Sequence, residues 1–134
     1  MTGHVLIIED DPDIAEILQY VLENENFETR VAHTGEEGLT ACLDKRNPPS
    51  LILLDLLLPG MSGIELCRRL RKEALTHSTP VLIVSARVSE RDIAASRELG
   101  VEDYITKPFS VREIVARVNS ILDDRHQPRR SGTL

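Results

Sequence analysis

The chain has 134 residues, of which 41% are hydrophobic and 28% are charged, and its formal net charge is −6. This composition is typical of one soluble globular domain, and the length is sufficient to bury a core without disulfides or metals. The acidic balance argues against direct nucleic-acid binding by this domain, which would normally require a basic face. A DNA-binding partner or a second domain is not excluded.

The N-terminus leads directly into a strand pattern, without the basic and apolar segments of a secretory signal peptide. No apolar stretch approaches the roughly 20 residues that a membrane-spanning helix needs. We therefore expect a cytoplasmic location and no membrane association. Cys42 and Cys67 have neither zinc-ligand spacing nor the pattern of a disulfide framework, and we interpret them as reduced, packed thiols.

The first third of the chain has the pattern of a strand, a helix and a second strand. Residues 5–8 form a continuous apolar run, and Pro12 favours the first position of a helix. The buried face of this helix is expected to contain Ile14, Ile17, Leu18, Val21 and Leu22. Residues 27–31 alternate between apolar and polar side chains, which is typical of a half-exposed strand.

The middle third repeats this alternation. A second helix is expected from about residue 34 to residue 46, where Asn47-Pro48-Pro49 ends it. Residues 51–54 form a wholly apolar third strand that ends at Asp55, and a loop at residues 58–63 leads into a third helix.

The last third predicts two further strands and two further helices. Residues 81–84 form an apolar strand that ends at Ser85, and residues 104–106 form a short fifth strand. The helix between them, at about residues 90–99, is weakly amphipathic, and Gly100 ends it. Its apolar stripe consists of little more than Ile93, Ala94 and Ala95. The final helix carries Ile114, Val115, Val118, Ile121 and Leu122.

Strict alternation of strands and helices predicts a parallel sheet with helices on both faces. The first, third and fourth strands are continuous apolar runs and belong in the centre, whereas the second and fifth belong at the edges. With right-handed connections, the order 2-1-3-4-5 satisfies these constraints. We therefore predict a doubly wound, flavodoxin-like (βα)5 α/β fold, in which ligands bind at the carboxyl ends of strands one and three.

We expect this domain to cover residues 1–122. Residues 123–134 have no apolar period and are interpreted as a linker or a disordered tail. The final residues, from Arg129 to Leu134, favour a piece of a longer protein over a self-contained one.

Chemically distinctive residues follow four of the five strands: Glu9 and Asp10, then Asp55, Ser85 and Lys107. Carboxylates that meet at one edge of a sheet repel each other unless a cation lies among them, and oxygen ligands of this kind suit Mg²⁺. A lysine and a hydroxyl opposite them suit a phosphoryl group. A metal, a carboxylate nucleophile and an ammonium are the components that phosphoryl transfer requires.

Each of these residues also has an ordinary structural explanation. Asp55 or Ser85 alone could be a turn residue, and Lys107 alone could be a solvated side chain. Asp11, which precedes Pro12, is interpreted as a helix cap. The joint occurrence at four strand ends favours the chemical interpretation. No role is assigned to His4, His33, His77 and His126.

Four segments resemble the bacterial response-regulator receiver family in their order and spacing: residues 7–11, 54–63, 84–86 and 103–109. The resemblance covers about residues 4–122. It implies that Asp55 accepts a phosphoryl group from a histidine kinase and forms an acyl phosphate. It also implies that Asp10, Asp55 and the backbone carbonyl of Leu57 coordinate Mg²⁺, with Glu9 acting through water.

The resemblance implies a switching mechanism as well. Lys107 would pair with a phosphate oxygen, and the Lys107–Pro108 peptide would be cis. Ser85 would move to the phosphoryl group, and Tyr104 would rotate into the space vacated. The face made by the fourth helix, fifth strand and fifth helix would then change shape. Tyr104 could instead be an edge-strand aromatic without a switching role.

The C-terminal part most resembles receivers that precede a winged-helix DNA-binding domain. Phosphorylation there drives homodimerisation, and Asp103 and Arg117 match positions that form an intersubunit ion pair. Glu113 matches a charged position of the same face. Arg97 stands where leucine is usual in these receivers. This difference bears on the expected geometry of the dimer and leaves the expected phosphorylation chemistry unchanged. DNA would be bound only through an effector domain outside this chain.

The expected function is a signalling switch and not an enzyme, since the chain would catalyse only its own phosphoryl transfer and dephosphorylation. The alternative is a free-standing receiver that acts by protein–protein binding or in a phosphorelay. A phosphatase with an aspartate nucleophile would have a second Asp at position 57, where this chain has Leu57. A flavin carrier is disfavoured because Glu9-Asp10-Asp11 would repel its phosphate.

Overall fold

The computed structural model describes residues 3–86 and 89–126. Its five parallel strands form one sheet in the order β2-β1-β3-β4-β5, which confirms the predicted topology. The strands are β1 (Val5–Ile8), β2 (Thr29–Ala32), β3 (Leu51–Leu54), β4 (Val81–Ser85) and β5 (Asp103–Thr106). The helices are α1 (Pro12–Asn24), α2 (Gly35–Cys42), α3 (Gly63–Arg71), α4 (Glu90–Glu98) and α5 (Val111–His126).

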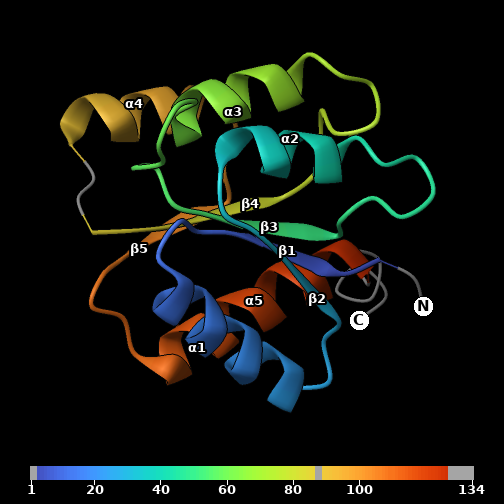
Figure 1. The fold of residues 1–134 in the computed structure, drawn as a ribbon, viewed down its shortest axis with the longest axis vertical. Helices are drawn as coiled ribbons and strands as arrows, with labels where there is room; N and C mark the ends of the chain where they lie inside the picture. The colour runs from blue at the N-terminus through green and yellow to red at the C-terminus, as the bar shows by residue number, and fades with distance from the viewer. Residues whose placement is uncertain (1–2, 87–88, 127–134) are drawn as a thin grey trace, which may run out of the picture.

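The sheet is covered on both faces, with α1 and α5 on one side and α2, α3 and α4 on the other (Figure 1). Successive side chains of a strand point to opposite faces, so each central strand contributes to two apolar layers. Ile7 packs in the cluster that contains α1 and α5, whereas Leu6 and Ile8 pack in the cluster that contains α2 and α3. This explains why β1 and β3 are continuous apolar runs.

The strands are aligned at their carboxyl ends. Ile8 pairs with Ala32 of β2 and with Leu54 of β3, and Leu54 pairs in turn with Ile83 of β4. The residues that follow β1 and β3 therefore emerge at the same edge of the sheet.

Two helices differ from the expectation in the residues that they bury. Ile17 was expected on the buried face of α1, but it is 49% exposed, and Ala15 is buried instead. The apolar arc of α1 is centred near Leu18, and Ile17 lies at its edge. In α4, Ala94 is exposed and Ser96 is buried, so the predicted stripe was only partly correct.

Two helix ends also differ from the expectation. The second helix ends at Cys42 and not near residue 46, because Asp44 forms a turn that competes with helical bonding. The last helix continues beyond Leu122 to His126, so residues 123–126, expected in the tail, are helical. The prediction for residues 127–134 lies outside the described residues. Within the described part of the chain, no helix is long and apolar enough to cross a membrane.

Asp11 caps α1, as predicted. Its carboxylate accepts hydrogen bonds from the backbone N–H groups of Asp13 (2.9 Å) and Ile14 (3.4 Å). This carboxylate thus satisfies N–H groups that have no partner within the helix. The role of Asp11 is structural, which separates it from Glu9 and Asp10.

Gly63 allows α3 to begin directly against the end of β3. A Cβ atom at this position would lie 2.7 Å from the backbone oxygen of Asp55 and 2.7 Å from Cα of Leu56.

We expect Gly63→Ala to lower the free energy of unfolding by about 1 to 3 kcal/mol in urea denaturation, because the backbone must shift to admit the methyl group. Glu90→Ala, at the exposed first position of α4, is the matched control and should change stability by less than about 0.5 kcal/mol. Equal stability of the two variants would show that the loop yields without cost.

Candidate functional site

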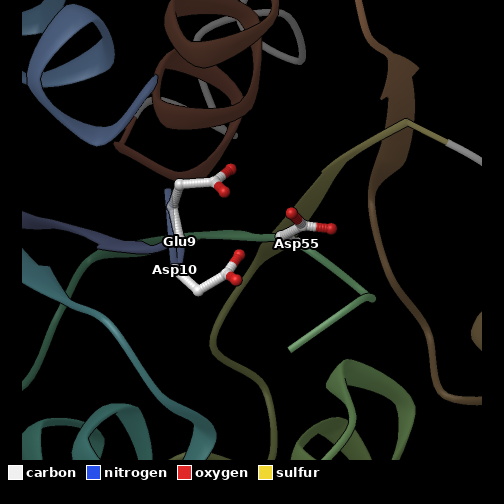
Figure 2. A group of neighbouring side chains, drawn as sticks. All are labelled: Glu9, Asp10 and Asp55. Carbon is white, nitrogen blue, oxygen red and sulfur yellow. The ribbon is translucent and has the colours of Figure 1, made fainter. Parts of the chain in front are cut away.

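Three carboxylates meet at the carboxyl ends of β1 and β3. Figure 2 shows Glu9 and Asp10 beside each other, with Asp55 across from them. One oxygen atom from each lies within 4.8 Å of the others, and Asp10 is exposed whereas Glu9 and Asp55 are buried. The cluster is therefore open to solvent on the Asp10 side, and its oxygen atoms could hold a metal ion.

Lys107 supplies a positive charge to this cluster. Its Nζ donates to Oε1 of Glu9 at 2.7 Å and to Oδ2 of Asp55 at 2.9 Å. The three side chains are 13%, 3% and 5% exposed, respectively, so the ion pairs are largely shielded from water. When all three carboxylates are ionised, one ammonium leaves a formal excess of two negative charges. That excess matches a divalent cation.

The pKa values of Glu9 and Lys107 are shifted by this arrangement. Burial raises the pKa of Glu9 above its ordinary value of 4.5, although the hydrogen bonds from Lys107 and from the N–H of Asp11 act in the opposite direction. Burial tends to lower the pKa of Lys107, but hydrogen bonds to Asp55 and Glu9 outweigh it and raise that pKa above 10.5. Lys107 therefore stays cationic at neutral pH.

Hydrogen bonds fix the orientation of the Asp55 carboxylate. Its Oδ1 accepts from the backbone N–H of Leu57 at 3.0 Å and from the hydroxyl of Ser85 at 3.0 Å, while its Oδ2 accepts from Lys107. The structure thus brings together the residues that were predicted to meet: Glu9 and Asp10 after β1, Asp55 after β3, Ser85 at the end of β4 and Lys107 after β5. The Lys107–Pro108 peptide is cis, as the resemblance implied.

A family model for the response regulator receiver domain matches residues 5–119. The chain belongs to the response regulator receiver domain family. The uncharacterized transcriptional regulatory protein YkoG of Bacillus subtilis is 44% identical over 120 residues, which cover 90% of this chain and 51% of YkoG. The DNA-binding response regulator MtrA of Mycolicibacterium smegmatis is 42% identical over 122 residues, which cover 91% of this chain and 51% of MtrA. The receiver domain thus spans about half the length of these curated relatives.

Solved structures agree with this assignment. A putative response regulator from Chloroflexus aurantiacus has a TM-score of 0.81 and 39% identity, with 90% of this chain and 98% of that chain covered. A CheY-like receiver domain protein from Methanospirillum hungatei has a TM-score of 0.88 and 28% identity, with 96% and 99% covered. The fold of this receiver domain is therefore shared with solved receivers along nearly their whole length.

Two predicted roles at the site stay predictions. The N–H of Leu57 is bonded to Asp55 and its side chain is exposed, but metal binding by its carbonyl is not tested by these contacts. Tyr104 is half-buried and packs against the apolar cluster that contains α2 and α3. This position is compatible with a switching residue and with a plain edge-strand aromatic.

The residues predicted for a dimer face are joined within this receiver domain. Arg117 forms an ion pair with Asp103 of β5, and its Nη2 lies 3.9 Å from Oε2 of Glu113 on α5. An intersubunit pair between Arg117 and Asp103 would therefore require exchange of these intrachain contacts.

Sequence reasoning missed His33, which follows β2. Its Nδ1 lies 3.0 Å from the backbone oxygen of Glu9. The signal was available, because His33 follows β2 as Glu9 follows β1, and those strands are neighbours in the sheet. His33 thus contacts the backbone that carries the acidic residues.

Lys107→Met tests the electrostatic balance of the site. Removing the ammonium leaves Glu9 and Asp55 buried without their cation, so we expect the free energy of unfolding at pH 7 to fall by about 3 kcal/mol without added metal. Without Lys107 the pKa of Glu9 rises further. A raised folded-state pKa favours the folded state at low pH, and that contribution is lost as pH rises through it. The deficit should therefore shrink when the pH is lowered toward 4.

Chemical denaturation at several pH values measures this deficit. Lys45→Met, which removes an exposed lysine, is the control and should leave stability nearly unchanged. A deficit in Lys107→Met that is equally large at pH 4 and pH 7 would contradict the proposed repulsion between Glu9 and Asp55.

Proposed function

We propose that this receiver domain is a phosphorylation-dependent switch that accepts a phosphoryl group on Asp55 from the phosphohistidine of a histidine kinase. The observation that carries the proposal is that the Asp55 carboxylate pairs with the Lys107 ammonium, which also pairs with Glu9, and lies across from the carboxylates of Glu9 and Asp10. An oxygen of Asp55 would attack phosphorus as the phosphorus–nitrogen bond of phosphohistidine breaks. The products are an acyl phosphate on Asp55 and a neutral imidazole on the kinase, with the proton that the ring needs coming from solvent or already carried on its other nitrogen.

The acidic cluster fits Mg²⁺, which prefers oxygen ligands and retains several waters. Asp10, Asp55 and the carbonyl of Leu57 would hold the ion, with Glu9 acting through water. The bound cation would neutralise charge on the transferred phosphoryl group. Lys107 would pair with a phosphoryl oxygen, since its ammonium already contacts Asp55.

The switch would begin with Ser85, whose hydroxyl already bonds to Asp55. We infer that Ser85 moves so that its hydroxyl donates a hydrogen bond to the phosphoryl group. Tyr104 would then turn inward, and the face of α4, β5 and α5 would change shape. The names of the relatives support an output through DNA binding by an effector domain outside this chain. The domain would then act in the cytoplasm as a signalling module and not as an enzyme on other substrates.

The phosphoacceptor is tested with a small phosphodonor. Incubation with Mg²⁺ and acetyl phosphate should add the mass of one phosphoryl group, and Asp55→Asn should abolish the addition, because an amide cannot form the acyl phosphate. Intact-protein mass spectrometry measures both, and Asp13→Asn, an exposed carboxylate in α1, is the control. Phosphorylation of Asp55→Asn at the wild-type rate would refute the assignment.

The metal site is tested by calorimetric titration with Mg²⁺. Asp10→Ala removes a predicted direct ligand, so we expect the affinity to fall by about tenfold or more. Asp13→Ala removes a nearby exposed charge of the same sign and should reduce affinity far less. Unchanged affinity in Asp10→Ala would remove Asp10 from the metal site.

Dimerisation is tested with beryllofluoride and Mg²⁺ as a phosphoryl mimic. Arg117→Glu should weaken mimic-dependent dimerisation by about tenfold, because it turns an attractive pair with Asp103 into a repulsive one. Sedimentation velocity measures the effect, and Arg112→Glu in the first turn of α5 is the control. A dimer that is indifferent to Arg117→Glu would mean that another surface is used.

A further inference from the structure

Helix α4 has few attachments to the core. Ser96 is its buried residue, and the Ser96 hydroxyl donates to the carbonyls of Asp92 (2.8 Å) and Ile93 (3.1 Å) in the same helix. The main packing partner of α4 is the neighbouring helix α3. A helix with so little apolar burial can shift at low cost, unless particular contacts hold it.

Arg71, the last residue of α3, provides such a contact at the C-terminal end of α4. Its Nε donates to the carbonyl of Leu99 at 2.7 Å, and its Nη1 donates to the carbonyls of Thr76 (3.0 Å) and Thr79 (2.9 Å). Leu99 is the C-cap of α4, where carbonyls have no intrahelical donor. The guanidinium thus opposes the negative end of the helix dipole and joins α4 to the segment between α3 and β4.

The same end of α4 has further attachments. Leu99 and Val101 pack against the apolar cluster that contains α2 and α3. The N–H of Val101 donates to Ser96 at 3.1 Å, and the N–H of Glu102 donates to Val81 of β4 at 2.8 Å. Between them, Gly100 has a φ of +71°, a conformation that ends the helix.

The N-terminal end of α4 is held differently. Its described hydrogen bonds lie between the cap and the first turn of the helix. The N–H of Asp92 donates to the Ser89 hydroxyl at 3.0 Å, and the N–H of Ile93 donates to the Ser89 carbonyl at 2.9 Å. Glu90 and Arg91 are exposed. This is also the end of α4 that is nearer in sequence to Ser85, the residue bonded to Asp55.

We propose that Arg71 anchors the C-terminal end of α4, so that a change at Asp55 moves the N-terminal end of this helix about a fixed point. Ser85 is the last residue of β4, so its displacement would act on the N-terminal end of α4, which has the weaker described attachments. Arg71 is then a positioning residue of the switch, because α3 begins beside Asp55 at Gly63 and ends at Arg71. This inference rests on the proposed phosphorylation of Asp55.

Amide hydrogen exchange followed by NMR tests the anchor at single residues. In the wild-type protein, beryllofluoride with Mg²⁺ should lower the protection of the Ile93 amide by about tenfold and leave Leu99 and Val101 within about threefold of their resting values. In Arg71→Met, the amides of Leu99 and Val101 should exchange about tenfold faster even without the mimic, because the charge-assisted bond to Leu99 is lost.

Arg68→Met is the matched control, since Arg68 is an exposed arginine of the same helix that pairs with Glu65 at 3.5 Å. Arg71→Lys keeps the charge but cannot span the same carbonyls as the planar guanidinium, and it should accelerate the exchange of Leu99 by about threefold. If Arg71→Met does not fold, the lysine variant carries the test.

If the Leu99 amide exchanges at the same rate in the Arg71 variants as in Arg68→Met, Arg71 does not anchor the helix and the proposal is wrong. A mimic that deprotects Leu99 and Val101 as strongly as Ile93 would overturn it too. Intact mass after acetyl phosphate treatment is measured on the same preparations. If no phosphoryl mass appears, the proposed function fails on its own, and the resting-state exchange of the Arg71 variants still decides whether the anchor exists.

Discussion

The site depends on one constraint: carboxylates that end neighbouring parallel strands must share an edge of the sheet with a cation. Lys107 meets part of this requirement, because its ammonium donates to Glu9 after β1 and to Asp55 after β3. Asp10 adds a third carboxylate on the solvent side. The remaining excess of negative charge could hold a divalent cation, which is the ion that the proposed phosphoryl transfer requires.

The rest of the fold makes this charged edge tolerable. β1 and β3 are buried along their whole length, and two apolar layers hold them in register. This burial also raises the pKa of Glu9, so the folded chain retains a carboxylate in surroundings that disfavour its charge. The apolar layers around the strands therefore provide the stability. The carboxylates at the strand ends repel each other, and this repulsion is fully relieved only when a cation binds among them.

Much of this arrangement was predictable from the sequence. Continuous apolar strands determine the strand order, and that order places Glu9, Asp55 and Lys107 at one edge. Side-chain partners were not predictable, because which donors share Oδ1 of Asp55 depends on the path of the loop before α3. Periodicity also misplaced Ile17, at the margin of an apolar arc. It cannot reveal the role of Arg71, whose three carbonyl partners lie in two segments outside α3: the end of α4 and the connection between α3 and β4.

The central claim is that the phosphoryl group resides on Asp55 and on no other carboxylate of the cluster. Borohydride reduction of the phosphorylated protein, followed by peptide mass spectrometry, tests this directly, because the reductant converts an aspartyl phosphate to homoserine. We expect homoserine at position 55 alone, and only when both Mg²⁺ and the phosphodonor were present. Homoserine at position 10, or the 2-amino-5-hydroxypentanoic acid that reduction of a phosphorylated Glu9 would give, with Asp55 unchanged, would contradict the account.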